Sequence, residues 1–260
     1  MSAPAVLVLA GLDPSGGAGL LADAEAIRAC GARPFCLATA LTVQTSRRAL
    51  RFEPVSPALV LEQARALLEE EPIAALKLGM LGTAAMLDAA VWIARTAKVP
   101  LVIDPVLRAS SGAPLFDGDP SAYRALFSLG AIVTPNLDEC ATLLFLDAPP
   151  ASLEEMALAG RSLLGLGATA ALIKGGHLAS PHSSTDLLVT AAGAYELAGP
   201  RHPGTKRGTG CRLAGALAAQ LASGKSLLVS ARLAKAYVGR YLVGSHEPAP
   251  AAGSTDEGAG

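Results

Sequence analysis

The sequence has little of what marks membrane, secreted or nucleic-acid-binding proteins. Aromatic residues make up only 4% of its 260 residues. No apolar stretch reaches about 18 residues, the length needed to span a bilayer, without a charge or a turn signal. The formal net charge is −1, so no basic surplus favours nucleic acid. We therefore expect neither nucleic acid nor a membrane among the partners.

Cysteines and export signals are equally scarce. Cys30, Cys36, Cys140 and Cys211 have neither metal-ligand nor disulfide-framework spacing. The apolar run near the N-terminus has no basic region before it and leads into a glycine-rich loop, so we interpret it as a buried first strand. These features predict reduced thiols and a cytoplasmic location.

Short apolar runs instead alternate with helical stretches. The predicted strands are Val6–Ala10, Phe35–Leu41, Ala74–Leu78, Leu101–Ile103, Ala131–Val133 and Ala170–Ile173. The predicted helices are Leu20–Cys30, Pro57–Glu70, Ala84–Ala97, Ser121–Leu129, Leu137–Leu144 and Leu153–Leu166. Continuous apolar strands are buried on both faces, and strand–helix alternation implies a parallel sheet covered by helices on both sides. We predict an α/β fold of three layers, αβα.

The pattern changes near the C-terminus. Thr185–Thr190 and Ala194–Leu197 are predicted to form an antiparallel hairpin, followed by helices at Thr209–Ser223 and Ser226–Gly244. Without a repeat or a linker, residues 1–247 are predicted to form a single domain. Residues 248–260 are rich in Pro, Ala and Gly, and we expect them to be disordered.

In such a sheet, ligands bind outside the carboxyl ends of the strands, so the loops there carry the candidate site. The first loop, Gly11–Gly19, contains four glycines, which permit close backbone approach to a ligand. Asp23 follows in the next helix, where it either faces a ligand or interacts with the helix dipole. Gly17–Ala22 matches the dinucleotide pattern GxGxxA, which suggests an NAD oxidoreductase as an alternative. That pattern requires a tight turn directly after the strand and an acid about 20 residues later, and neither is present.

Two further loops suit a flat ring. Gln44, after Val43, offers both an acceptor and donors, which matches a heteroaromatic ring bearing an amine and a ring nitrogen. Met80 lies between Gly79 and Gly82, where it either packs on a flat ligand or fills the core. An exposed loop glutamine is the alternative for Gln44.

Acidic residues follow two strands. Asp104 and Glu139 are candidate Mg²⁺ ligands, because Mg²⁺ uses one or two carboxylates and keeps several waters. Asn136 and Glu139 also have the Asn-x-x-Glu spacing of a helix N-cap. The spacing does not separate a cap from a metal site.

The last loops suit an anion. Lys174 follows a strand, and Gly208-Thr209-Gly210-Cys211 opens an apolar helix whose N-terminal N–H groups favour a phosphate. A helix N-terminus also lowers the pKa of a thiol, so Cys211 is either reactive or an ordinary buried residue at a cap. The sequence has no Gly-x-x-x-x-Gly-Lys-Ser/Thr, which excludes a P-loop kinase.

Taken in order, these motifs resemble the hydroxymethylpyrimidine (phosphate) kinases, thiamin-biosynthesis enzymes of the ribokinase-like superfamily, over residues 5–245. The resemblance rests on Ala10–Gly19, Thr39–Gln44, Gly79–Leu81, Asp104–Val106, Thr134–Leu137, Lys174–His177 and Gly208–Cys211. It implies a ribokinase-like fold, ATP and Mg²⁺ as cofactors, and a homodimer. It also implies phosphorylation of the hydroxymethyl group of 4-amino-5-hydroxymethyl-2-methylpyrimidine and of the resulting monophosphate.

The resemblance also implies residue roles. Gly11, Asp23, Val43, Gln44 and Met80 would bind the aminopyrimidine. The ATP phosphates would contact Lys174, Asn136, Thr209 and Arg207, with Gly208, Thr209 and Gly210 forming the anion hole. Cys211 would be the base, where much of the superfamily has Asp, and Asp104 and Glu139 would organise Mg²⁺.

The chain departs from this family at three positions. Arg207 replaces a His, Arg212 replaces a Thr or Ser, and Ala113 replaces an acid. We expect the two arginines to favour the Cys211 thiolate. The departures leave two alternatives: a pyridoxine/pyridoxal kinase of the same branch, and a catalytically silent ligand-binding homologue.

Overall fold

The computed structural model describes residues 2–109, 112–176, 178, 183–202 and 206–244. Within these residues a nine-stranded sheet has the order β11-β10-β9-β8-β6-β4-β1-β2-β3. Its parallel strands are β1 (Ala5–Leu12), β2 (Arg33–Gln44), β4 (Ile73–Leu78), β6 (Leu101–Ile103), β8 (Ile132–Val133) and β9 (Ala170–Ile173). The antiparallel members are β3 (Ala49–Pro54), β10 (Ser183–Thr190) and β11 (Gly193–Pro200). The predicted mostly parallel sheet is confirmed.

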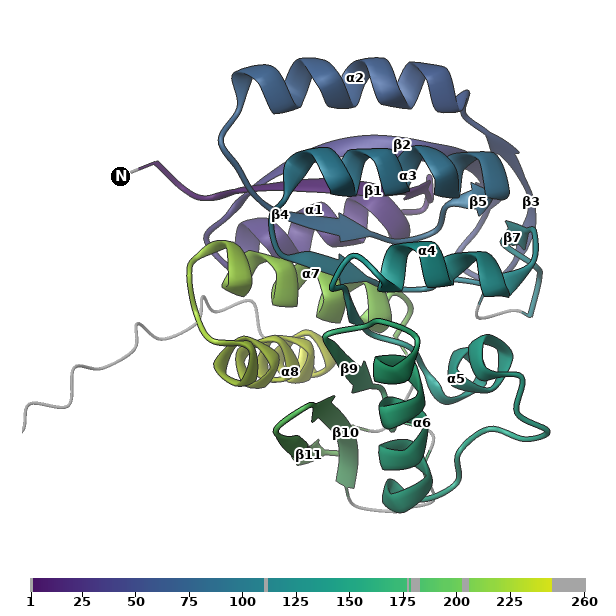
Figure 1. Cartoon of the computed structure of the whole chain (residues 1–260), viewed down its shortest axis with the longest axis vertical. Coiled ribbons are helices and arrows are strands. Elements are labelled where there is room, and N and C mark those ends of the chain that lie inside the picture. Colours follow the sequence, from purple (N-terminus) through teal and green to yellow (C-terminus); the bar gives the residue numbers. More distant parts are fainter. Residues whose placement is uncertain (1, 110–111, 177, 179–182, 203–205, 245–260) are drawn as a thin grey trace, which may run out of the picture.

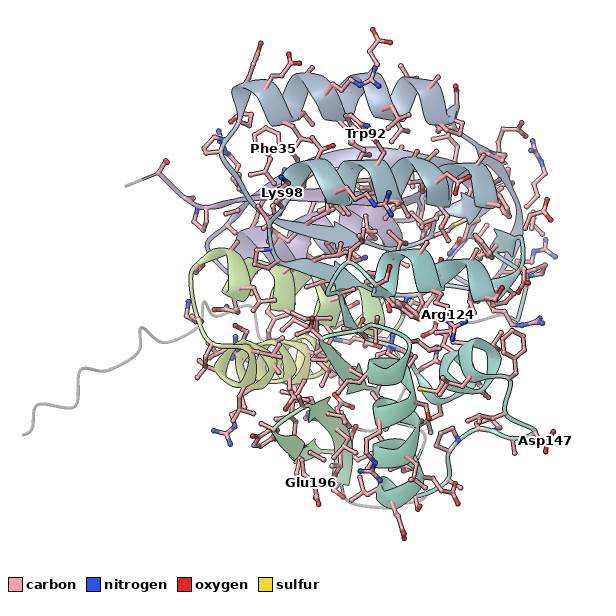
Figure 2. All side chains as sticks on the ribbon, in the orientation of Figure 1. Phe35, Trp92, Lys98, Arg124, Asp147 and Glu196 are labelled. Carbon is pink, nitrogen blue, oxygen red and sulfur yellow. The ribbon has the colours of Figure 1, made fainter. Side chains whose placement is uncertain are left out.

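Helices cover both faces of the sheet (Figure 1). They are α1 (Gly19–Ala29), α2 (Pro57–Glu70), α3 (Ala84–Ala97), α4 (Arg124–Phe127), α5 (Leu137–Leu144), α6 (Leu153–Gly165), α7 (Thr209–Ala222) and α8 (Leu227–Val243). The three-layer prediction is confirmed. Charged side chains such as Lys98, Arg124 and Asp147 lie on the outside (Figure 2).

Successive side chains of β1 point to opposite faces of the sheet and pack into two separate cores. Leu7 and Leu9 point into the larger core, beside α2, α3 and α6. Val6, Val8 and Ala10 point to the opposite face, beside α1, α7 and α8. The second face uses small residues, so its helices approach closely. A Cβ on Gly215 of α7 would lie 3.2 Å from the carbonyl oxygen of Asp23 in α1.

Three local predictions differ from the structure. β3 was missed because its sequence is exposed and charged, as suits an edge strand. The small parallel pair β5 (Gly82–Thr83) and β7 (Phe116–Asp117) is too short to leave a periodic signal. The predicted helix Ser121–Leu129 begins instead as a 3₁₀ turn at Pro120–Tyr123, where proline fits the first turn.

The tail predicted to be disordered, 248–260, lies outside the described residues. No helix in the described part of the chain is both long and apolar enough to cross a bilayer.

Candidate active site

A cavity of about 1630 Å³ opens at the carboxyl ends of the parallel strands, between the loops that follow them and the N-terminal end of α7. Pockets for one drug-sized ligand are usually about 300–1,000 Å³, so this cavity has room for two small molecules. Most of the predicted site residues line it: Gly11, Gln44, Met80, Asp104, Asn136, Glu139, Lys174, Arg207, Gly208, Thr209, Gly210 and Cys211. The topology therefore brings together residues that are widely separated in sequence.

Two predicted substrate-binding residues lie elsewhere. Asp23 is fully buried beneath the site, where its Oδ2 accepts a hydrogen bond from Lys77 Nζ at 2.7 Å. Burial raises the pKa of Asp23 to about 6, although the Lys77 ammonium opposes this shift. Val43 is 42% exposed, and the strand alternation of β2 turns its side chain away from the face that Thr42 and Gln44 share. Neither residue lines the cavity.

The glycine-rich loop and Met80 form one wall. A Cβ on Gly11 would come within 2.7 Å of Met80 Sδ, so only glycine leaves room for this sulfur. Met80 is 5% exposed and packs with Ala40 and Leu115, yet it also lines the cavity. Both interpretations of Met80, core residue and ligand contact, therefore apply at once.

Lys174 is the centre of a charged cluster. Its Nζ lies 2.7 Å from Asp104 Oδ1 and 3.6 Å from Glu139 Oε2. Burial alone would lower the pKa of Lys174, but the two carboxylates raise it. Burial raises the pKa of Glu139 to about 7 despite the nearby ammonium. The pKa of Asp104 is lowered, because Lys174 and Lys77 together outweigh its burial.

Asn136 and Glu139 do form the predicted helix cap. The Oδ1 of Asn136 accepts a hydrogen bond from the N–H of Glu139, and Glu139 Oε2 accepts one from the N–H of Asn136, both at 2.8 Å. The same Glu139 oxygen faces Lys174. One residue therefore caps α5 and lines the site.

The protein side chains beside the cavity fit a Mg²⁺ ion only if a substrate phosphate and waters supply further ligands. The described residues contain no group of three or more His, Cys, Asp or Glu side chains placed to hold a metal. Asp104 and Glu139 supply two carboxylates beside the cavity, which matches the habit of Mg²⁺ of binding one or two carboxylates, waters and substrate phosphates. These two residues would hold it.

The start of α7 forms an anion site. Gly208 has φ of 70°, and a Cβ there would collide with the carbonyl oxygen of Gly17. A Cβ on Gly210 would lie 3.1 Å from Lys174 Nζ. The two glycines therefore let the first turn of α7 lie against both the first loop and Lys174. The N-terminal N–H groups of the helix and the ammonium share one part of the cavity, which suits a phosphate.

Cys211 projects from that first turn, but its electrostatics differ from the prediction. Burial raises the pKa of Cys211 to about 12, although the charge of Lys77 and a hydrogen bond from the Gly19 N–H act to lower it. The expectation that Arg207 and Arg212 favour the thiolate is wrong. Arg212 is held by Glu25 at 2.5 Å, and Arg207 is paired with Asp13, so both cations are neutralised by other partners.

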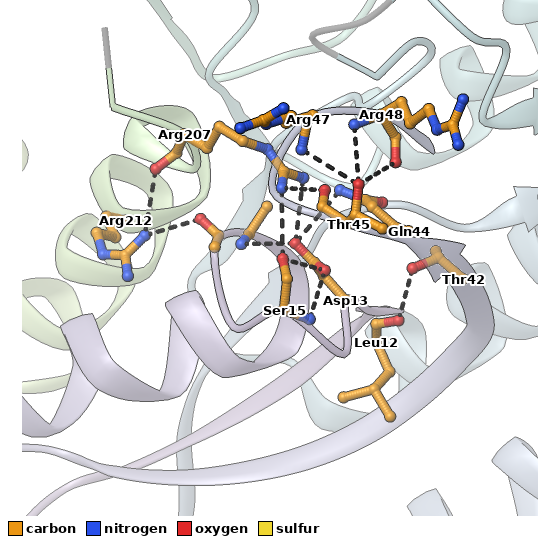
Figure 3. Close-up of polar contacts among 12 residues, drawn as sticks. Leu12, Asp13, Ser15, Thr42, Gln44, Thr45, Arg47, Arg48, Arg207 and Arg212 are labelled. Carbon is orange, nitrogen blue, oxygen red and sulfur yellow. Dashed lines mark hydrogen bonds and ion pairs between the residues drawn. The ribbon is translucent and has the colours of Figure 1, made fainter. Parts of the chain in front are cut away.

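Asp13 is the main site residue that sequence reasoning missed. It is 2% exposed and lines the cavity. Arg207 NH2 donates to its Oδ2 at 3.2 Å, and Gln44 Nε2 donates to the same oxygen at 3.3 Å (Figure 3). An acid directly after an apolar strand was the available signal. Lys77 offered a similar signal, because it is the one charged residue within another apolar strand.

A cavity for two small molecules, with an anion site beside paired carboxylates and a lysine, is typical of an enzyme that transfers phosphoryl groups between them, a small-molecule kinase. Comparison with known proteins shows that the chain belongs to the phosphomethylpyrimidine kinase family, whose model matches residues 13–256. The fold is ribokinase-like, as in the solved structures of related kinases.

Three relatives illustrate the similarity. The hydroxymethylpyrimidine/phosphomethylpyrimidine kinase of Escherichia coli is 40% identical over 220 residues, which covers 82% of this chain and 81% of that protein. The crystal structure of phosphomethylpyrimidine kinase from Clostridium difficile has a TM-score of 0.78 at 28% identity, covering 92% of this chain and 99% of that one. Pyridoxal kinase from Staphylococcus aureus, in complex with AMP-PCP and pyridoxal, has a TM-score of 0.84 at 28% identity, covering 93% and 88%.

Proposed function

We propose that this kinase transfers the γ-phosphoryl group of ATP to the hydroxymethyl group of 4-amino-5-hydroxymethyl-2-methylpyrimidine, and a second one to the monophosphate, in thiamin biosynthesis. The observation that carries the proposal is the shared cavity, which is lined both by the anion site of α7 with Lys174 and by Gln44 and Met80. The names of the curated relatives support the same substrate. A nucleotide analogue in the related S. aureus structure supports ATP as the donor.

The residues around the transferred group act mainly through position and charge. Phosphoryl transfer has a loose transition state whose negative charge spreads over the phosphoryl oxygens. The N–H groups at the start of α7 and the Lys174 ammonium stabilise that charge without reorganising. Asp104 and Glu139 in turn hold Lys174 in place. A Mg²⁺ ion held by Asp104 and Glu139 would supply positive charge that neutralises the phosphates.

Cys211 has a limited part in this mechanism. At neutral pH its raised pKa keeps the sulfur protonated, and a loose transition state requires the hydroxyl proton to leave only late. The sulfur accepts that proton in the thiolate form, whose population grows about tenfold per pH unit below the pKa. The amides and Lys174 therefore supply most of the rate.

Turnover tests the proposal directly. We expect ADP release when the protein is mixed with ATP, Mg²⁺ and hydroxymethylpyrimidine, and far less when Mg²⁺ is removed by a chelator. A panel of hydroxymethyl-bearing heterocycles provides the comparison. Binding of the pyrimidine without ADP release would instead identify a catalytically silent homologue.

Replacement of Cys211 tests its role as the base. We expect Cys211→Ala to lower kcat by at most about 100-fold, the lower range for general-base catalysis, because little thiolate is present at neutral pH. The kcat of the unaltered protein should rise with pH above neutrality, whereas that of Cys211→Ala should not. Cys211→Asp should retain activity and flatten the rise, because a carboxylate is already ionised. Cys36→Ala, at an exposed cysteine, is the control. Full turnover by Cys211→Ala would contradict the assignment.

Pyridoxal is the second candidate substrate. The observation that favours it is the similarity to the S. aureus pyridoxal kinase across 93% of this chain. Pyridoxal is also a flat aza-aromatic ring with a hydroxymethyl group. Turnover of the two substrates side by side decides between them, and a higher kcat/KM for pyridoxal would reverse our assignment.

Two further expectations remain predictions. We propose a homodimer, which sedimentation of the purified protein would test. We also propose a cytoplasmic location, which cell fractionation would test.

A further inference from the structure

Arg207 connects three segments at the edge of the cavity (Figure 3). Its NH1 donates to the carbonyl oxygen of Thr45 at 2.7 Å and to Ser15 Oγ at 3.3 Å, while NH2 pairs with Asp13 Oδ2 at 3.2 Å. Its own carbonyl oxygen accepts a hydrogen bond from the Tyr241 hydroxyl at 3.3 Å. Both ends of the residue are therefore held, and the guanidinium has a fixed position.

Asp13, the buried partner of Arg207, acts as the acceptor in all of its side-chain hydrogen bonds. Its Oδ1 accepts from the N–H and the hydroxyl of Ser15, at 2.9 and 2.7 Å. Its Oδ2 accepts from the Ala18 N–H at 3.1 Å, in addition to Arg207 and Gln44. An ionised carboxylate has acceptors alone. Any amide side chain beside it must therefore present its NH₂ end.

Gln44 is that amide. Its Nε2 lies 3.3 Å from Asp13 Oδ2, and the opposite orientation would place two oxygens against each other. The carbonyl oxygen Oε1 is therefore the end left for a ligand, and Gln44 lines the cavity. Among the residues that the structure describes, none donates a hydrogen bond to this oxygen.

We propose that Arg207 is a positioning residue that acts through Asp13 to fix the Gln44 amide with its carbonyl oxygen facing the substrate. The cavity then selects rings that present an N–H donor at this edge, as an aminopyrimidine does. It disfavours rings that present a carbonyl or phenolate oxygen there, because two acceptors would meet. This inference rests on the proposed function, in which Gln44 contacts the substrate ring.

The test compares two ligands that differ at one group. The first is hydroxymethylpyrimidine, and the second is its 4-oxo analogue, in which oxygen replaces the exocyclic amine. Calorimetry gives the dissociation constant of each, without requiring turnover. We expect the unaltered protein to prefer the amine by about 10- to 100-fold, the range for an unmade hydrogen bond to a buried group.

Variants of the chain then change the preference. An Asn at position 13 can turn its NH₂ toward Gln44 and reverse that amide, so Asp13→Asn should lower the preference by about tenfold or more. Arg207→Met, which keeps the length of the side chain but lacks its donors, should lower it several-fold. Arg207→Lys retains the charge without the fork of donors, and it should lie between Met and Arg. In turnover, KM for the amine should rise more than kcat falls.

Arg48→Ala is the matched control. Arg48 is an exposed arginine in the turn between β2 and β3, which also contains Thr45. Its side chain points away from Asp13 (Figure 3). Its loss removes an equal charge near the site and should leave the preference unchanged. Thermal unfolding checks that each variant is folded, and if Asp13→Asn fails to fold, the two Arg207 variants carry the test.

The outcomes separate the inference from the proposed function. If the protein phosphorylates the pyrimidine but the Asp13 and Arg207 variants keep the original preference, the inference alone is overturned. If Arg48→Ala changes the preference as much as Arg207→Met, overall charge rather than amide orientation is responsible, and the inference is likewise overturned. If the unaltered protein binds neither pyrimidine, both fail.

Discussion

Lys77 and Lys174 lie on parallel strands or directly after them, and each pairs with a carboxylate at 2.7 Å. Their surroundings differ. The side chains of Lys77 and Asp23 are both 0% exposed, whereas that of Lys174 is 16% exposed and lines the cavity beside Asp104 and Glu139. Lys77 also borders the cavity, but it has no exposed surface and its bond to Asp23 links α1 to the sheet, whereas Lys174 is accessible to a ligand. Access to solvent, more than charge or pairing, separates a structural ion pair from a reactive one.

The buried pair should produce the largest effect when one partner is removed. Lys77→Met leaves the fully buried Asp23 without its partner, and breaking a buried pair by removing one member costs about 3–5 kcal/mol. Denaturant unfolding measures this loss. The double variant Lys77→Met, Asp23→Leu should recover most of it, because two apolar residues of similar size need no partner. If the double variant is as unstable as the single one, the ion pair is not the cause.

Lys174 should respond in the opposite way. Lys174→Met removes the ammonium that would donate hydrogen bonds to the transferred phosphoryl group. We expect kcat to fall about 100- to 1,000-fold, as for removal of one preorganised hydrogen-bond donor. Its stability should change less than that of Lys77→Met, because Asp104 and Glu139 line the cavity, from which water can enter the space that the lysine leaves. Steady-state kinetics and denaturant unfolding on the same samples check both parts. An equal loss of stability in the two variants would remove the distinction.

The smallest expected effect concerns pH. Because burial raises the pKa of Glu139 to about 7, the folded protein favours the protonated carboxyl. This contribution to stability is complete below the ordinary pKa of a glutamate and is lost as the pH rises through about 7.

Glu139→Gln does not ionise and retains the cap, so the ligand-free variant should gain a few degrees in Tm relative to the parent between pH 5 and 8. Glu155→Gln, the exposed residue at the same cap position of α6, should show no such trend. A pH-independent difference at Glu139 would contradict the assigned shift.

The sequence predicted whatever depends on local pattern. Apolar runs marked the parallel strands, and the Gly208–Cys211 motif marked an anion site at a helix start, because both signals lie within a few residues. The pairing of Asp13 with Arg207 joins residues 194 positions apart, and no local pattern indicates it. Asp23 shows a related difficulty. A carboxylate near a glycine-rich loop looks the same in sequence whether it faces a ligand or a buried lysine, and the packing of α1 on the sheet decides between them.

The close contact between the starts of α1 and α7 has an evolutionary consequence. Gly208 and Gly215 let these two helices meet without intervening side chains, so backbone contacts fix where the N-terminal N–H groups of α7 lie in the phosphate end of the cavity. The ring end is instead defined by side chains such as Gln44 and Arg207. Mutations can therefore change which ring is accepted while the transfer geometry is inherited unchanged. In such a scaffold, new substrate preferences arise by single substitutions at one end of the cavity.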